Sequence, residues 1–345
     1  MSKLFKTNIS IGLALFVFTI ACRMSQSIAD FYSLQIYPLI SGGLSYISSL
    51  APFALQDVAI CCIVIGAIAV IVTSVKKRWG WKRCVSYELA ILLWTYLWFY
   101  TCWCNNYARS SIFVRTSTKQ EQFDKTKFNA FIHSFAQDIN EAWTDDSLCD
   151  KDELEREVKM FYANAPKQYG LAEPKSWQHP KAMTVSRFYS AVGVQGYMAP
   201  LLSESFINKD VLPFDYPFVY AHEYSHLLGV SSEAEANWWA FHACISSCNP
   251  AIRYSGYKGV LNHVIINARN FLSKEEYEEW IDTFRPEVLN DIEVTRNHWL
   301  VLHSPIFNDM QDMIYDLFLK GNKVSSGKKN YSEVVQLLIS LEHPE

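Results

Sequence analysis

The segment "YAHEYSHLLGVSSEAEAN", residues 220–237, holds the residue types of a metal site. His222 and His226 are four residues apart, so on a helix both imidazoles lie on one face and can reach a single ion. Glu223 lies about 100° around the helix from His222, which places it beside the ion and not on it. This spacing predicts a zinc-bound water with Glu223 as its general base.

A catalytic zinc needs a third protein ligand and leaves its fourth position to water. In "SSEAEAN" the candidates are Glu233 and Glu235. Ser231 or Ser232 can cap a helix that begins here, so that Glu233 falls in its first turn. Glu235 points about 160° away from Glu233 on that helix, so the two glutamates cannot both face the ion. We select Glu233, because Asn237 on the same face can hold a neighbouring group; Glu235 stays as the alternative.

The helix that carries both histidines has recognisable ends. Asp215 can cap its first turn, Pro217 suits that turn, and Gly229 fits its C-terminal end. Helical patterns dominate from about Pro217 to the C-terminus. Before this helix, residues 183–208 carry β-branched and aromatic residues between Gly and Pro breaks, which predicts short strands. The histidine helix is therefore expected to follow a small sheet.

Helices are also expected earlier in the soluble part of the chain. Residues 118–143 have apolar positions at helical spacing, and residues 150–163 form a charged helix with Asp150 as a possible cap. Residues 166–180 are rich in Pro and loop-like. Residues 111–345 are thus expected to form a mostly α (α+β) zincin-like domain with a small sheet.

The first 110 residues differ from the rest by their long apolar runs. Val58–Val75 is uncharged for 18 residues and Leu89–Ala108 for 20, whereas Thr7–Cys22 is uncharged for only 16. A transmembrane helix needs roughly 20 such residues. We expect an α-rich membrane protein with three transmembrane helices, at about residues 7–23, 56–75 and 86–107. The first run also fits a signal peptide, because two lysines precede it; we favour an uncleaved span.

The basic residues predict the orientation of these helices. The loop "KKRWGWKR", residues 76–83, packs five basic side chains between the second and third runs. Such short loops stay cytoplasmic. Lys3 and Lys6 place the N-terminus on the same side. The chain is therefore expected to be a multi-pass protein of the cell membrane, with residues 111–345 extracytoplasmic.

The amino-acid composition restricts the classes of binding partner that we expect for this chain. The net charge is only -4, and no basic stripe appears in the soluble part, so no nucleic acid is expected. Of nine cysteines only Cys149, Cys244 and Cys248 belong to that part. An odd number does not indicate a disulfide framework, and Cys244 and Cys248 fit small core residues better than a bridge. The expected partners are the lipid bilayer and a peptide or protein substrate.

The motif-bearing segments resemble known families. "HEYSH" followed by "EAEAN" is similar to the gluzincin pattern of membrane metallopeptidases, including the prenyl-protein endopeptidases, where a glutamate precedes "xxAD"; Asn237 replaces the usual Asp. A closer resemblance, over most of the chain, is to the domain-of-unknown-function 3810 family of bacterial membrane proteins. It is carried by "IYPLISGGLSYISSLAPFALQD", "WCNNYAR", "GVQGYMAPLLSESFIN", "HEYSHLLGVSSEAEAN", "RYSGY" and "YSEVVQLL". This resemblance implies a zinc-dependent protease with no established substrate.

A peptidase also needs a donor for the developing oxyanion. "IRYSGYKG" offers Tyr254 and Tyr257, which the resemblance favours, and His263 follows. Packing is the other interpretation of both tyrosines. Upstream, "QGYMAPLLSES" could supply an edge strand that pairs with an extended peptide. Glu204 in this stretch is expected to be a surface carboxylate.

These residues predict a membrane-anchored zinc metallopeptidase. Zn²⁺ would bind His222, His226 and Glu233, while Glu223 would deprotonate the water and pass the proton to the leaving amine. The alternative is a non-catalytic membrane protein whose metal-stabilised domain binds a peptide or a cell-envelope component. Glu223 favours catalysis, because a structural zinc site needs no general base and has four protein ligands. A hydrolase of a non-peptide amide is a third interpretation.

Overall fold

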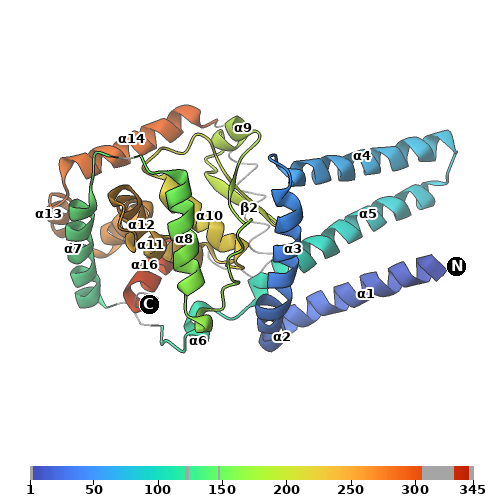
Figure 1. The fold of residues 1–345 in the computed structure, drawn as a ribbon, viewed down its shortest axis with the longest axis horizontal. Helices are drawn as coiled ribbons and strands as arrows, with labels where there is room; N and C mark the ends of the chain where they lie inside the picture. The colour runs from blue at the N-terminus through green and yellow to red at the C-terminus, as the bar shows by residue number, and fades with distance from the viewer. Residues whose placement is uncertain (1–2, 121–123, 147, 305–329, 342–345) are drawn as a thin grey trace. The chain divides into compact units, whose positions relative to one another are not determined.

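A computed structural model describes residues 3–120, 124–146, 148–304 and 330–341 (Figure 1). The described residues are mostly helical, with one three-stranded sheet. The chain divides into two compact units. The first comprises residues 1–110, 175–178 and 198–204, and the second comprises residues 111–174, 179–197 and 205–345.

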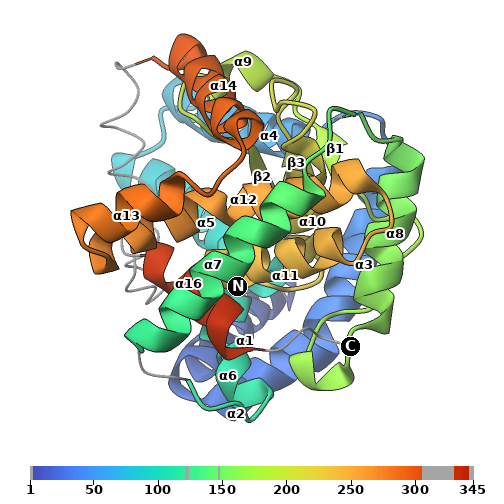
Figure 2. The same ribbon diagram turned by 90° about the vertical axis from the view of Figure 1, so that its left-hand side faces the viewer.

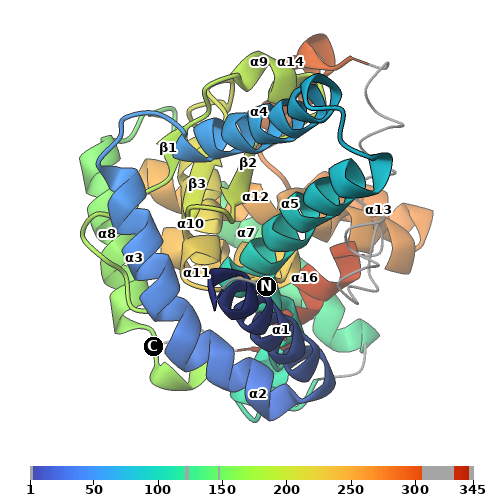
Figure 3. The ribbon, with the colours of Figure 1, turned by 90° about the vertical axis from the view of Figure 1, so that its right-hand side faces the viewer.

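Three long helices dominate the first unit (Figure 3). They are α1 (Lys3–Met24), α4 (Leu55–Lys76) and α5 (Trp81–Cys102). Helix α5 packs against both α1 and α4. Only two of the described helices, α1 over Thr7–Met24 and α4, are long and apolar enough to cross a membrane. Since α1 lies near the N-terminus, these helices are consistent with membrane association or with a signal sequence.

The expectation of a third apolar span at residues 86–107 is wrong in two respects. Helix α5 begins earlier, at Trp81, so its first eight residues include Lys82, Arg83 and Glu88. Its many Trp, Tyr and Thr residues also lower its mean hydropathy, because their polar groups favour an interface over the apolar interior. Moreover, the helix ends at Cys102, and Cys104–Ala108 forms a separate 3₁₀ helix, η2.

The segment between the first two apolar helices is itself helical. It contains α2 (Gln26–Phe31), a π-helical turn η1 (Tyr32–Ile36) and α3 (Tyr37–Ser49). The Tyr32 hydroxyl donates to the Thr101 carbonyl at 2.7 Å, and Ser33 Oγ donates to Asn106 Oδ1 at 2.7 Å. These buried bonds join the segment to the end of α5 and to η2.

Glu204 is not a surface carboxylate, contrary to the expectation. Its side chain is 2% exposed and accepts hydrogen bonds from the backbone N–H groups of Leu55, at 3.2 Å, and Gln56, at 2.7 Å. These groups open α4 and have no partner within the helix. The negative charge also complements the helix dipole. The neighbouring Leu201 N–H donates to Gln56 Oε1 at 3.1 Å, so residues 198–204 join the first unit.

The second unit is a helical assembly (Figure 2). Its helices are α6 (Ile112–Arg115), α7 (Lys125–Ala142), α8 (Lys151–Asn164), α9 (Ser186–Ser190), α10 (Tyr216–Leu227), α11 (Glu233–Ile245), α12 (Pro250–Phe271), α13 (Lys274–Ile281), α14 (Pro286–Leu302) and α16 (Asn330–Ser340). Helix α11 packs against α8, α10, α12 and α16, and its Trp238 and Trp239 are fully buried. Gly256 allows the close approach of α12, because a Cβ there would lie 2.7 Å from Cys244 Cβ. Cys244 is thus a core residue with a free thiol, as predicted. Cys248 is also free but exposed, so the prediction of a core residue is wrong there.

The helix expected at residues 118–143 is present but shorter, because residues 118–120 are not helical and α7 begins at Lys125. The helix expected at residues 150–163 is α8, and both helices have capped starts. Asp124 accepts from the Thr126 N–H at the start of α7, while Asp150 accepts from the Asp152 and Glu153 N–H groups at the start of α8. Residues 121–123, which fall inside the first of these expected helices, lie outside the described residues. The Pro-rich stretch at 166–180 is loop apart from a short 3₁₀ helix, η3 (Lys167–Tyr169).

The sheet precedes the histidine helix, as expected. Its strands are β1 (Lys181–Ala182), β2 (Gly196–Ala199) and β3 (Glu204–Ile207), in the order β1-β3-β2. Strands β1 and β3 are parallel, with Lys181 opposite Phe206. Helix α9, inside the stretch predicted as strands, was not expected. Tertiary bonds hold it, because Ser190 Oγ donates to Asp210 Oδ2 at 2.6 Å.

Candidate metal centre

Helix α10 begins where the sequence predicts, but for a different reason. Asp215 precedes the helix without capping it. Its carboxylate instead accepts from Lys258 Nζ at 2.6 Å and from Thr295 Oγ1 at 3.1 Å. Ser255 Oγ takes over part of the capping and accepts the Phe218 N–H at 3.0 Å. A buried lysine charge is costly unless it is paired, which explains why the carboxylate turns to Lys258.

A short turn joins α10 to α11. Gly229 has φ 97°, a left-handed conformation that glycine adopts without strain. The Gly229 N–H donates to the His226 carbonyl at 3.0 Å. Three residues later Ser232 Oγ accepts the Glu235 N–H at 3.3 Å and caps α11. The first turn of α11 is thereby brought back to the last turn of α10.

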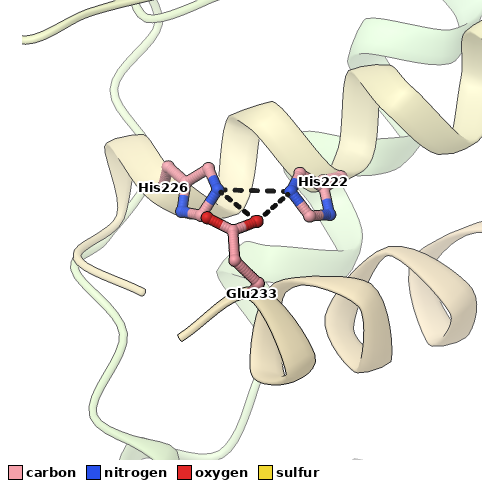
Figure 4. A group of neighbouring side chains, drawn as sticks. All are labelled: His222, His226 and Glu233. Carbon is pink, nitrogen blue, oxygen red and sulfur yellow. Dashed lines mark hydrogen bonds and ion pairs between the residues drawn. The ribbon is translucent and has the colours of Figure 1, made fainter. Parts of the chain in front are cut away.

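His222, His226 and Glu233 meet across this turn (Figure 4). Glu233 Oε2 lies 3.2 Å from His222 Nε2 and 3.8 Å from His226 Nε2, and the two Nε2 atoms are 3.2 Å apart. Among the described residues, these three form the group whose donor atoms, within 4.8 Å of one another, could hold an ion. Two imidazole nitrogens and one carboxylate oxygen match the ligand set of a catalytic zinc.

The remaining ring nitrogens are held by partners that orient the imidazoles. His222 Nδ1 lies 2.9 Å from Asn237 Oδ1, and His226 Nδ1 lies 2.7 Å from the Val230 carbonyl. Both partners are acceptors, so each Nδ1 carries a hydrogen, and each Nε2 is left as the atom that can bind an ion. Asn237 thus holds a neighbouring group, as its position one turn after Glu233 predicts.

The charges of the three ligands stabilise one another. Burial alone would raise the pKa of Glu233, but the two histidines hold it well below its usual value. Burial alone would lower the pKa of His226, yet Glu233 and Glu223 raise it to about 9. The carboxylate is therefore ionised and ready to bind a cation. A metal ion must displace the proton on His226 when it binds.

Glu223 lies beside the three ligands in a water-poor position. Its side chain is buried, and its Oε2 accepts from Ser205 Oγ of β3 at 3.3 Å. Burial raises the pKa of Glu223, while the nearby His226 and His222 act in the opposite direction. A carboxyl group with a raised pKa, close to but not among the donors, suits proton transfer.

Glu235, the alternative ligand, is engaged elsewhere. It forms a buried ion pair with the guanidinium group of Arg115 from α6 and accepts from Trp239 Nε1 at 3.4 Å. Arg115 also donates from Nε to the Tyr169 carbonyl at 3.0 Å. The structure therefore brings Glu233, and not Glu235, to the two histidines. The sequence could not show this, because Arg115 is 120 residues away from Glu235.

The structure does not bring the hydroxyls of Tyr254 and Tyr257 to the three ligands through any described contact. The Tyr254 hydroxyl donates to Asp291 Oδ2 at 2.7 Å. The Tyr257 ring packs edge-on against Phe135 and Phe241, with centroid distances of 5.6 Å and 5.4 Å. Both contacts agree with the packing interpretation of these residues. Their role as oxyanion donors stays a prediction.

His263 is electrostatically linked to the site. Burial lowers the pKa of His263 to about 4, and the charge of His222 lowers it further in the same direction. The imidazole is therefore neutral at physiological pH. In the sequence, the only sign that His263 could belong to the site was its position nine residues after Tyr254.

Comparison with known families agrees with the sequence resemblance. A model of the family described as "Protein of unknown function (DUF3810)" matches residues 32–339. The chain belongs to this family. No curated protein and no solved structure matches the chain. The DUF3810 match includes both histidines, Glu223 and Glu233. Because the family description gives no activity, a function for this DUF3810 member must be argued from the site.

Proposed function

We propose that the protein is a membrane-anchored, zinc-dependent metallopeptidase. The observation that carries this proposal is the convergence of His222 Nε2, His226 Nε2 and Glu233 Oε2, with the buried carboxylate of Glu223 beside them. Three protein donors leave one zinc position for water, and a general base is at hand. A purely structural site has four protein ligands and needs no such base.

The chain's own residues account for the proton transfers of peptide hydrolysis. Zinc bound by His222, His226 and Glu233 would polarise a water molecule and the substrate carbonyl. Glu223 accepts the proton of the attacking water and returns it to the leaving amine. The raised pKa of Glu223 makes its carboxylate a stronger base, which favours the first of these transfers. Asn237 keeps His222 in the tautomer that binds the ion.

Strand β2 favours a peptide as the substrate. It is the outer strand of the order β1-β3-β2, so its far edge can pair with an extended chain. Gly196, the first residue of β2, lies directly against the Glu223 side chain. A peptide paired along this edge would therefore pass beside the general base. This proximity favours peptides over small non-peptide amides.

We place the second unit outside the membrane. The basic loop between α4 and α5, "KKRWGWKR", would stay cytoplasmic with the N-terminus. Helix α5 does not qualify as an apolar span by length and composition alone. In this proposal it crosses the bilayer packed against α1 and α4 and carries the chain outward, with its Trp and Tyr side chains at the interface. A non-catalytic protein that binds a cell-envelope component through the same metal-stabilised unit is the second candidate, and it predicts metal without hydrolysis.

Metal analysis and a peptide-cleavage assay on the full-length chain in detergent test the proposal. The native protein should hold one zinc and cleave members of a broad peptide library. Glu223→Gln should keep the zinc and lose cleavage, whereas His226→Ala should lose both. Zinc in the native protein without any cleavage would support the non-catalytic candidate. Absence of zinc after purification in zinc-containing buffer would refute the site itself.

A further inference from the structure

Two strands hold the side chain of Glu223 between them and α10. On β3, Ser205 is fully buried and its hydroxyl donates to Glu223 Oε2 at 3.3 Å. On β2, the backbone of Gly196 lies close against the same side chain. A Cβ at residue 196 would lie 2.5 Å from both Cγ and Cδ of Glu223, and closer still to Oε1. Real Cβ atoms are not found at such distances.

Space, and not backbone conformation, is what requires glycine at residue 196. Gly170, Gly193 and Gly229 have left-handed φ values, but Gly196 does not. Alanine could therefore adopt the backbone conformation of Gly196 without strain. It could not do so beside Glu223 in its present position, because the Cβ and the carboxylate would occupy the same space.

We propose that Gly196 and Ser205 are positioning residues that set the place of the Glu223 carboxylate. The inference rests on the proposed function, since it assumes that Glu223 is the general base. Gly196 fixes how closely β2 approaches the carboxylate, while Ser205 fixes the direction in which Oε2 points. A general base must lie within hydrogen-bond reach of the proton that it accepts, and a displacement of about 1 Å can cost about 100-fold in rate.

The same arrangement links the base to the substrate. Gly196 belongs to the edge strand along which a peptide would pair, so one stretch of backbone would set both the register of the peptide and the place of the base. The reacting carbonyl and Glu223 are then aligned by a rigid element and not by a loop. Substitutions at residues 196 and 205 should accordingly affect kcat more than KM.

Kinetics of full-length variants test the role in catalysis. Gly196→Ala should lower kcat by about 100-fold, with KM and zinc content close to those of the native protein. Ser205→Ala should lower kcat by about tenfold, and Ser205→Thr, which keeps a hydroxyl, should restore most of it. An unchanged kcat in Gly196→Ala, or equal losses in Ser205→Ala and Ser205→Thr, would overturn the proposal.

A thermal-unfolding cycle tests the same contact without any substrate. Gly196→Ala should lower Tm when Glu223 is present and should have little effect in the Glu223→Ala background, where the space is free. Equal shifts of Tm in both backgrounds would overturn the proposal. If Gly196→Ala does not fold, folding of the Gly196→Ala/Glu223→Ala double variant supports it, and failure of both overturns it.

The two tests separate the inference from the proposed function. A native protein that cleaves no peptide refutes the proposed function, and the unfolding cycle alone then decides whether Gly196 holds Glu223. A native protein that cleaves peptides but shows no coupling in the cycle keeps the proposed function and overturns the inference.

Discussion

At the residue scale, the site depends on which atom of each side chain is left available. Asn237 and the Val230 carbonyl occupy the Nδ1 atoms of the two histidines, so both Nε2 atoms point toward Glu233. Arg115 forms an ion pair with Glu235, so Glu233 is the glutamate of the "EAEAN" segment that reaches the histidines. The helical period could narrow the third ligand to one of two glutamates, but the choice depends on a partner that lies far away in the chain.

Removal of the Asn237 side chain should weaken zinc binding. Without its acceptor, His222 loses the bond that fixes its tautomer and orientation, and loss of such partners reduces metal affinity by about 10- to 100-fold. Competition with a chromogenic chelator measures the affinity of Asn237→Ala. Asn140→Ala, which removes an exposed amide that donates to the Thr283 carbonyl, serves as the control and should leave the affinity unchanged. Equal affinities for Asn237→Ala and the native protein would contradict the assigned role.

His263 should stay neutral across the physiological range and become a source of acid sensitivity below it. Its pKa is lowered from 6.5 to about 4 in the folded chain. The unfolded chain therefore binds a proton between these values, and the folded chain does not. The free energy of unfolding should fall by up to about 3 kcal/mol as pH decreases from 6.5 to 4. Urea unfolding of the native chain and of His263→Asn across this pH range measures how much of the pH dependence of stability comes from His263. Identical pH profiles for the two proteins would contradict the prediction.

At the scale of elements, helix α11 supplies one candidate ligand and the partner that orients another. It carries Glu233 and Asn237, and its buried Trp238 and Trp239 pack within the unit. The Tyr169 ring stacks on Trp238 at a centroid distance of 5.7 Å, and the Tyr169 carbonyl accepts from Arg115. The first turn of α11 is thus tied to α6 and η3 by charge, hydrogen bond and ring contact together.

Matched substitutions of the two glutamates should separate metal binding from helix anchoring. Glu233→Gln should lose zinc, and in the zinc-free chain it should lower the free energy of unfolding less than Glu235→Gln does, because the Glu233 side chain is 37% exposed. Glu235→Gln should keep zinc, but its free energy of unfolding should fall by about 3–5 kcal/mol, because the buried Arg115 charge loses its partner. Zinc content and chemical denaturation of the two full-length variants check both statements. Loss of zinc in Glu235→Gln at a temperature where the variant is folded would restore Glu235 as the ligand.

At the scale of the whole molecule, the two units differ in what their surfaces expose. Helices α1 and α4 present large apolar side chains along most of their length, whereas the second unit buries most of its own. Residues 175–178 and 198–204 belong to the first unit although they lie far along the sequence. Their composition does not mark them as part of an apolar region. Their grouping follows from individual bonds such as those of Glu204 with α4.

The exposed thiol of Cys248 provides a test of the proposed topology. Cys248 lies in the second unit, while Cys84 lies next to the basic loop between α4 and α5. Because Cys149 of the same unit is also a free thiol, the test uses a Cys149→Ser background. A membrane-impermeant maleimide added to right-side-out vesicles should label this chain and its Cys84→Ser derivative, but not its Cys248→Ser derivative. Labelling of Cys248 only after the vesicles are opened would place the second unit in the cytoplasm.

Local patterns in the sequence determined the features that depend on near neighbours. The four-residue spacing of His222 and His226, a cap at Ser231 or Ser232 and the helix end at Gly229 all follow from helical geometry and short-range hydrogen bonds. These features sufficed to place a candidate metal site between two helices. They also identified the family, since the motif-bearing segments persist along the chain.

Only the tertiary structure decided which partner each buried polar group has. Asp215 bonds Lys258 instead of capping α10, Glu204 caps α4 instead of facing solvent, and Glu235 pairs with Arg115. The need for glycine beside Glu223 also became visible only in three dimensions. The three carboxylates share one physical reason. A carboxylate removed from water must find a donor or a cation, and the nearest one in space is far away in the sequence.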